Sequence, residues 1–218
     1  AGLAHRILSI ALHDAEREDR VTRNVAALVR APAKDVNTRR NLTAEQAIAV
    51  LNKAAELDDA MAARWLIALL YGPRQGECLG LRWSDIGLYS IDIAWSLSSV
   101  PWQHGCDGTC DKRAASCPHR RYVIPTGMDY QPLYRNVVLM RPKNFAAIRV
   151  VPRLPIIDAA LALRLEQVQR DRPNYLTDRD LVFATPSGDP IATRTDYQEW
   201  TDLLAAAGHQ PADRGAAE

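Results

Sequence analysis

The sequence predicts an α+β fold that is mainly helical and carries a small antiparallel sheet. Segments with apolar residues at helical spacing come first, a segment with strictly alternating apolar residues follows, and helical segments return at the end. Because helices and strands are grouped rather than alternating along the chain, a parallel α/β sheet is disfavoured. The sequence also contains neither Gly-x-Gly-x-x-Gly nor Gly-x4-Gly-Lys-Ser/Thr, the phosphate-binding loops of nucleotide-binding folds.

Composition narrows the class of protein. The chain has 218 residues, of which 47% are hydrophobic, so it can bury a core as one domain or slightly more. Lys and Arg number 27 against 26 Asp and Glu, so any DNA-binding surface must be local. No apolar run is long enough to span a membrane, and four cysteines are too few for a disulfide scaffold. We therefore expect a cytoplasmic protein with no membrane partner.

The first forty residues predict a helical segment followed by a linker. Apolar residues at helical spacing over residues 3–20 predict an amphipathic helix, which needs a surface to pack against. Residues 31–40 are polar, include Pro32 and show no periodicity, as is typical of a linker. This pattern divides the chain into residues 1–30, a linker over 31–41, and a main domain over 42–218.

The main domain is expected to begin with three helices. Thr43 is the predicted N-cap of the first, with Gln46 placed to complete a capping box, and this helix should end near residue 57. A second helix is expected from about residue 58 until Gly72-Pro73 ends it, and a short third one over Gln75 to Trp83.

The centre of the sequence predicts the sheet, and helices follow it. One strand is expected over Tyr89–Ser98, with the odd-numbered residues Tyr89, Ile91, Ile93, Trp95 and Leu97 on one face. Asn136–Met140 and Ile148–Val151 are further strands, expected to flank a hairpin turn near Lys143. Helices are expected over Asp158–Arg170 and Thr195–Ala207, the last one capped by Gly208.

The most specific motif lies in Leu69–Ile86, which reads Leu-Leu-Tyr-Gly-Pro-Arg-Gln-Gly-Glu-Cys-Leu-Gly-Leu-Arg-Trp-Ser-Asp-Ile. It resembles the first catalytic-arginine motif of the tyrosine recombinase, or phage integrase, family. The resemblance implies that Arg74 is catalytic and binds a DNA phosphate through two oxygens, and that Glu77 orients it. Without this context, Arg74 and Glu77 could equally be an ordinary surface ion pair.

A second motif runs from Arg141 to Pro152 and resembles the β-hairpin lysine of the family followed by its Arg-x-Val-Pro strand. It implies that Lys143 is catalytic and protonates the departing 5′ hydroxyl, although a solvated lysine at a turn is the simpler alternative. Arg149 is expected to contact a phosphate, and so are the linker residues Arg39 and Arg40.

The resemblance extends over nearly the whole chain. Residues 1–30 are similar to the end of the core-binding domain with which the family grips DNA, and residues 42–218 to its catalytic domain. The implied function is site-specific DNA breakage and rejoining, in DNA recombination or integration, through a phosphotyrosine intermediate. The implied partner is double-stranded DNA at an attachment-type site, on which full-length relatives form tetramers. No catalytic cofactor is implied, because the phosphotyrosine conserves the bond energy.

One part of the family pattern is not found. Family members carry His-x-x-Arg and then the nucleophilic tyrosine after the position that matches Gly208, whereas here His209 and Arg214 are five residues apart and no tyrosine follows. Tyr197 precedes this region and is a poor substitute. We expect a catalytic domain truncated before its second motif, which forms no covalent DNA adduct, because its sequence either ends early or has a diverged tail. The alternative function is a non-enzymatic DNA-binding remnant of an integrase.

A group of cysteines lies between the predicted strands. Cys106, Cys110, Cys117 and His119 can supply four tetrahedral zinc ligands, with His104 as the alternative to His119. The segment resembles an insertion in some actinobacterial and actinophage integrases. A structural zinc would fold a loop that is poor in apolar residues. The alternative is a reduced, basic loop with free thiols.

Overall fold

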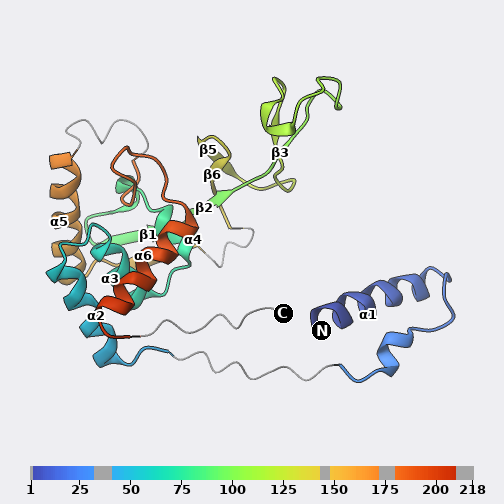
Figure 1. The fold of residues 1–218 in the computed structure, drawn as a ribbon, viewed down its shortest axis with the longest axis horizontal. Helices are drawn as coiled ribbons and strands as arrows, with labels where there is room; N and C mark the ends of the chain where they lie inside the picture. Colours follow the sequence, from blue (N-terminus) through green and yellow to red (C-terminus); the bar gives the residue numbers. More distant parts are fainter. Residues whose placement is uncertain (1, 32–40, 143–147, 172–179, 210–218) are drawn as a thin grey trace. The chain divides into compact units, whose positions relative to one another are not determined.

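The computed structural model describes residues 2–31, 41–142, 148–171 and 180–209 (Figure 1). The chain divides into two compact units, residues 1–41 and 42–218. No helix within the described ranges combines the length and the apolar character needed to cross a membrane.

The first unit consists of helix α1 (Gly2–Arg17) and the 3₁₀ helix η1 (Val25–Leu28). The Asn24 side chain caps η1 and also donates a 2.8 Å hydrogen bond to the carbonyl of Ser9 in α1, which ties the two helices together. No residue of α1 is buried, so its apolar face stays exposed within this unit. Most of the predicted linker, including Arg39 and Arg40, lies outside the described residues. The assignment of residues 1–30 to a core-binding domain stays a prediction.

The second unit opens with the predicted helices, although two of their bounds were wrong. Helix α2 (Ala44–Glu56) has the predicted capping box of Thr43 and Gln46. Helix α3 (Ala62–Tyr71) begins later than expected, because the Asp59 carboxylate accepts hydrogen bonds from Met61 N–H and Trp65 Nε1, both at 2.8 Å, and so forms a turn. Helix α3 ends at Gly72, whose φ of 59° is the left-handed conformation that glycine adopts without strain.

The third helix, α4 (Gln75–Leu79), is shorter than predicted, and the 3₁₀ helix η2 (Trp83–Asp85) follows it. Its two glycines pack directly on a strand backbone. A Cβ on Gly76 would lie 2.7 Å from the carbonyl oxygen of Leu97, and one on Gly80 would lie 2.8 Å from the Leu97 nitrogen. The glycines of the Arg74 motif therefore seat α4 against the sheet, which fixes the position of Arg74 at its start.

The predicted strand over Tyr89–Ser98 is two strands, β1 (Ser90–Ile93) and β2 (Ser96–Ser99). They pair antiparallel with different partners: β1 with β7 (Arg149–Pro152), and β2 with β6 (Val137–Met140), which also pairs with β5 (Tyr130–Tyr134). The buried face is as predicted except that Tyr89 is 80% exposed. The alternation continues across the break because the segment stays extended, so the sequence pattern does not reveal the change of partner.

The expected hairpin around Lys143 was wrong, because the strands on either side of it do not pair with each other. Strand β6 belongs to the three-stranded sheet β2-β6-β5, whereas β7 pairs with β1 in a separate sheet. Lys143 itself lies outside the described residues. A third pair joins β3 (Trp102–Gln103) to β4 (Arg121–Tyr122), with the 3₁₀ helix η3 (Ala114–Ser116) between them. We call residues 101–136 the arm, and Figure 1 shows β3 extending beyond β2, β5 and β6, away from helices α2 to α6 of the same unit.

The core lies among the helices and the inner face of β1 and β2. Helix α5 (Pro155–Asp171) and helix α6 (Thr193–Ala206) complete it, and Gly208 follows α6 with a φ of 79°. The largest fully buried side chains include Trp65, Phe183 and Leu79. The observed grouping of helices around small antiparallel sheets confirms the predicted α+β fold.

Candidate functional site

Arg74 stands at the N-terminus of α4, where the chain turns sharply out of α3. Its backbone is extended, and its N–H donates a 2.8 Å hydrogen bond to Oε2 of Glu77. The guanidinium contacts the other oxygen, Oε1, at 3.3 Å, yet the side chain is 78% exposed. The local sequence therefore holds Arg74 at the surface, with most of its donors directed to solvent.

Glu77 is buried, at 6% exposure, and it joins two elements that are distant in sequence. Besides Arg74, it accepts a 2.9 Å hydrogen bond from Nη2 of Arg149 on β7. Burial acts to raise the pKa of Glu77, but the hydrogen bonds from the Arg74 backbone and from Arg149, with the charges of both arginines, lower it overall. The ionised carboxylate thus holds Arg74 and Arg149 side by side.

Arg74 and Glu77 line a hollow of about 210 Å³ that continues onto the sheet. Trp95, Ser96 and Arg141 also line it. The Arg141 guanidinium stacks over the Trp95 ring, 4.9 Å from its centroid. Arg141 was not singled out from the sequence as a site residue, although it directly precedes the predicted Lys143 motif, because only the return of β6 to β2 brings it to Arg74.

A buried network supports the site from the helical side. Arg64 on α3 makes a bidentate pair with Asp196 on α6, at 2.6 and 2.8 Å, and both residues are buried. Gln75, directly after Arg74, donates to the same Asp196 carboxylate at 2.6 Å. Sequence reasoning missed this network because its two charged members are 132 residues apart.

The other predicted site residues are placed differently. Lys143, Arg39 and Arg40 lie outside the described ranges. Tyr197 lines a separate hollow beside Arg64, Gln75 and Asp196 and does not line that of Arg74.

Three of the four predicted metal ligands lie together in the arm, and His104 takes the place of His119 beside them. The structure groups His104, the alternative ligand, with Cys106, Cys110 and Cys117, while the His119 side chain is exposed and outside the group. A hydrogen bond with His104 is the largest of the effects that lower the pKa of Cys106, to about 5. The four side chains can hold a metal ion, as analysed below.

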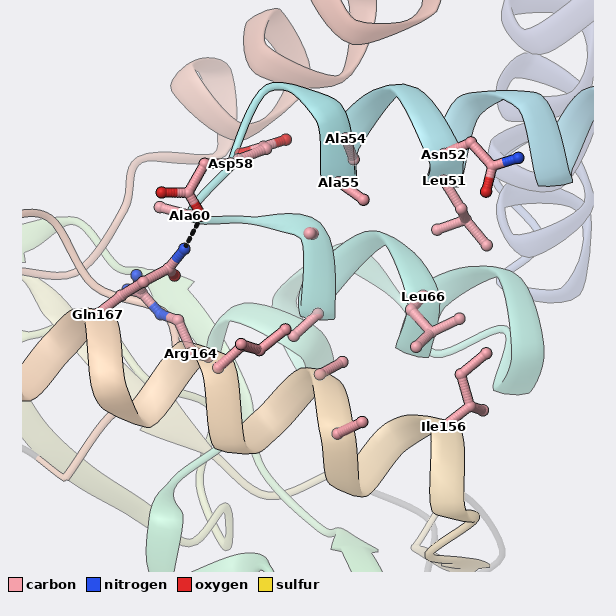
Figure 2. A pocket seen from close by; sticks show the side chains of 16 residues that line it. Leu51, Asn52, Ala54, Ala55, Asp58, Ala60, Leu66, Ile156, Arg164 and Gln167 are labelled. Atoms are coloured by element: carbon pink, nitrogen blue, oxygen red, sulfur yellow. Dashed lines mark hydrogen bonds between the residues drawn. The ribbon is translucent and has the colours of Figure 1, made fainter.

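A second groove is lined mainly by apolar side chains. Figure 2 shows it between α2, α3 and α5, lined by Leu51, Leu66 and Ile156, with a hydrogen bond from Gln167 to Asp58 at one end. It has a volume of about 340 Å³ and shares no lining residue with the Arg74 hollow. Because it lacks the exposed cationic group that phosphate chemistry needs, we do not assign it to the same site.

Comparison with known proteins gives one sequence relative and several solved folds. No family model matches the chain. An integrase of Saccharopolyspora erythraea is 27% identical over an alignment of 229 positions, which covers 94% of this chain and 52% of the relative. The chain thus spans about half the length of this relative.

The solved structures agree on the fold. An integrase of the Tn1549 transposon, in complex with transposon right end DNA, has a TM-score of 0.61 at 16% identity, covering 98% of this chain and 60% of that one. A lambda integrase tetramer bound to a Holliday junction has a TM-score of 0.56 at 18% identity, over 97% of this chain and 47% of that one. The XerA recombinase has a TM-score of 0.51 at 19% identity, over 87% and 52%. The chain therefore has the fold of the tyrosine recombinases, and the family resemblance predicted from the motif around Arg74 is confirmed.

Proposed function

We propose that the chain is the phosphate-binding part of a site-specific DNA recombinase or integrase, which breaks and rejoins DNA strands through a phosphotyrosine intermediate. The observation that carries the proposal is the exposed guanidinium of Arg74, held in place by the buried carboxylate of Glu77. An arginine fixed in this way presents its fork to two oxygens of one phosphate without first losing conformational freedom.

The charges around the hollow favour an anion. Arg74, Arg141 and Arg149 bring three positive charges to the neighbourhood of one buried carboxylate, that of Glu77. In the proposed reaction, Arg74 stabilises the negative charge that develops on phosphorus, and Glu77 is a positioning residue that contacts no substrate. Lys143 is proposed, from the motif alone, to protonate the leaving 5′ hydroxyl.

The relatives support the choice of partner. The sequence relative is an integrase, and the lambda and Tn1549 integrases of similar fold are bound to DNA. We therefore propose double-stranded DNA at an attachment-type site as the substrate, and assembly on DNA as a tetramer. We also propose that catalysis needs no cofactor and that the protein acts in the cytoplasm.

The phosphate site is tested by titrating the chain with double-stranded DNA at several salt concentrations. Binding should weaken linearly on a log–log plot of affinity against salt, and Arg74→Ala should reduce the slope by about one unit, because one phosphate contact is lost. Arg170→Ala is the matched control, since Arg170 is 68% exposed on α5 and pairs, among the described residues, with the neighbouring Asp171. Equal effects of the two substitutions would exclude Arg74 as the phosphate ligand, and an affinity independent of salt would overturn DNA binding.

A second experiment distinguishes DNA cleavage from DNA binding. The chain is incubated with suicide DNA substrates, and covalent adducts are detected on denaturing gels. A covalent adduct that is lost in Arg74→Ala would support the recombinase and would contradict the expectation of no cleavage drawn from the motifs. Salt-dependent binding without an adduct would favour the DNA-binding remnant instead.

A further inference from the structure

We propose that His104, Cys106, Cys110 and Cys117 bind one structural zinc ion that folds the arm. The proposal is independent of the DNA-binding site, because it rests on the geometry of these four side chains and on the lack of any other core around them. Of the two imidazoles that the sequence offered as the fourth ligand, it selects His104, the alternative, over His119.

Three of the distances between ligand atoms lie near those of tetrahedral coordination. Zn–S bonds of about 2.3 Å and Zn–N bonds of about 2.0–2.1 Å place two sulfurs roughly 3.8 Å apart, and a sulfur and a nitrogen roughly 3.6 Å apart. Nδ1 of His104 lies 3.7 Å from Sγ of Cys106 and 3.6 Å from Sγ of Cys110. The sulfurs of Cys106 and Cys117 are 3.4 Å apart, and all four ligand atoms lie within 4.8 Å of one another.

The same distances argue against a disulfide. An S–S bond measures about 2.0 Å, so Cys106 and Cys117 are in contact but not bonded, and all four cysteines of the chain are free. Three thiols and one imidazole around a common point form a ligand set that selects zinc, because carboxylate oxygens, which harder cations prefer, are absent from it.

The chain is shaped to bring His104 to the thiols. A Cβ on Gly105 would lie 2.2 Å from the backbone oxygen of His119, so the chain between His104 and Cys106 passes directly against the backbone just before β4. Asp107 and Gly108 have φ values of 50° and 85°, and the Thr109 N–H donates a 3.0 Å hydrogen bond to the Cys106 carbonyl, so the segment between Cys106 and Cys110 forms a turn. The backbone of His119 fills this crossing, and its side chain is exposed and lies outside the ligand group.

No apolar core is available to hold this arrangement. Across residues 101–136, all of which the structure describes, the one buried residue is Cys117, itself a proposed ligand. Around the ligands the regular structure is slight: β3 and β4 have two residues each and η3 has three, while the longer strand β5 belongs to the sheet with β6 and β2. Trp102 stacks on Tyr122 across β3 and β4. A segment of this length without a core needs a cross-link, and a metal supplies one whose binding energy is folding energy.

The experiment is metal analysis of the full chain purified without chelator, together with cobalt substitution. We expect one zinc per chain, and the cobalt form should show the absorption bands of a tetrahedral thiolate site. Cys117→Ser and His104→Ala should lose the metal, whereas His119→Ala and Cys78→Ala should keep it; His119 is the matched imidazole control and Cys78 a thiol outside the group. Helical circular dichroism checks that each variant remains folded.

Three outcomes would overturn the proposal. The first is a metal-free protein that gives no thiolate bands on cobalt titration. The second is a Cys106–Cys117 disulfide found by mass spectrometry after alkylation. The third is loss of metal in His119→Ala with retention in His104→Ala. If Cys117→Ser unfolds the whole chain, cobalt titration of the chelator-treated wild type still decides the question.

Discussion

The helical core and the arm belong to the same unit but are stabilised differently. Trp65, Leu79 and Phe183 are almost completely removed from water among the helices, whereas the arm buries Cys117 and no apolar side chain in its described residues 101–136. The core therefore gains its stability from buried apolar surface. The arm, in our proposal, gains it from a metal. A buried cysteine therefore has a different role in each region. Cys78 is a small apolar residue of the core, while Cys117, in our proposal, is a zinc ligand.

The largest expected effect follows from removing apolar volume in the core. Phe183→Ala should lower the free energy of unfolding by about 3–5 kcal/mol, because Phe183 has no exposed surface and leaves a cavity. The matched change in the arm, Val123→Ala, should stay within about 0.5 kcal/mol, since Val123 is 42% exposed. Urea unfolding followed by helical circular dichroism measures both. Similar losses for the two variants would break the distinction between the regions.

A smaller effect is expected from the charge of Glu77, which makes the unfolding free energy depend on pH. The folded pKa of Glu77 is lowered, so its contribution to stability is fully present above its ordinary value of 4.5 and is lost as the pH falls through the folded pKa. Glu77→Gln should therefore flatten the decline of the unfolding free energy between about pH 5 and pH 3. Glu166→Gln is the comparison, because the Glu166 side chain is exposed on α5, away from the carboxylate that pairs with Arg74 and Arg149. An unchanged slope in Glu77→Gln would show that Arg74 and Arg149 do not stabilise the ionised carboxylate.

The smallest expected effect is on the stability of the core when the proposed zinc ion is removed from the arm. A chelator should leave the unfolding free energy of the helical signal unchanged within about 0.5 kcal/mol, because none of the proposed ligands belongs to the hydrophobic core cluster. The same treatment should expose the arm to limited proteolysis near residues 104–121 while the helices resist. Cleavage that spreads to the helices would mean that the two regions unfold together.

The sequence by itself determined the α+β class, most helices, the capping box at Thr43 and the family resemblance around Arg74. These features depend on residues close in the chain, since helical periodicity, caps and turns at Gly72 act over a few positions. It also identified the three cysteines as a group, because they lie close together in the chain.

Only the tertiary structure decided the features that join distant residues. The strand over residues 89–98 divides between two sheets, because β6 and β7 offer separate edges to its two halves. Glu77 meets Arg149, and Arg64 meets Asp196, across separations that no local pattern records. The choice of His104 over His119 depends on a backbone crossing at Gly105, because spacing counts residues whereas coordination depends on where the chain returns.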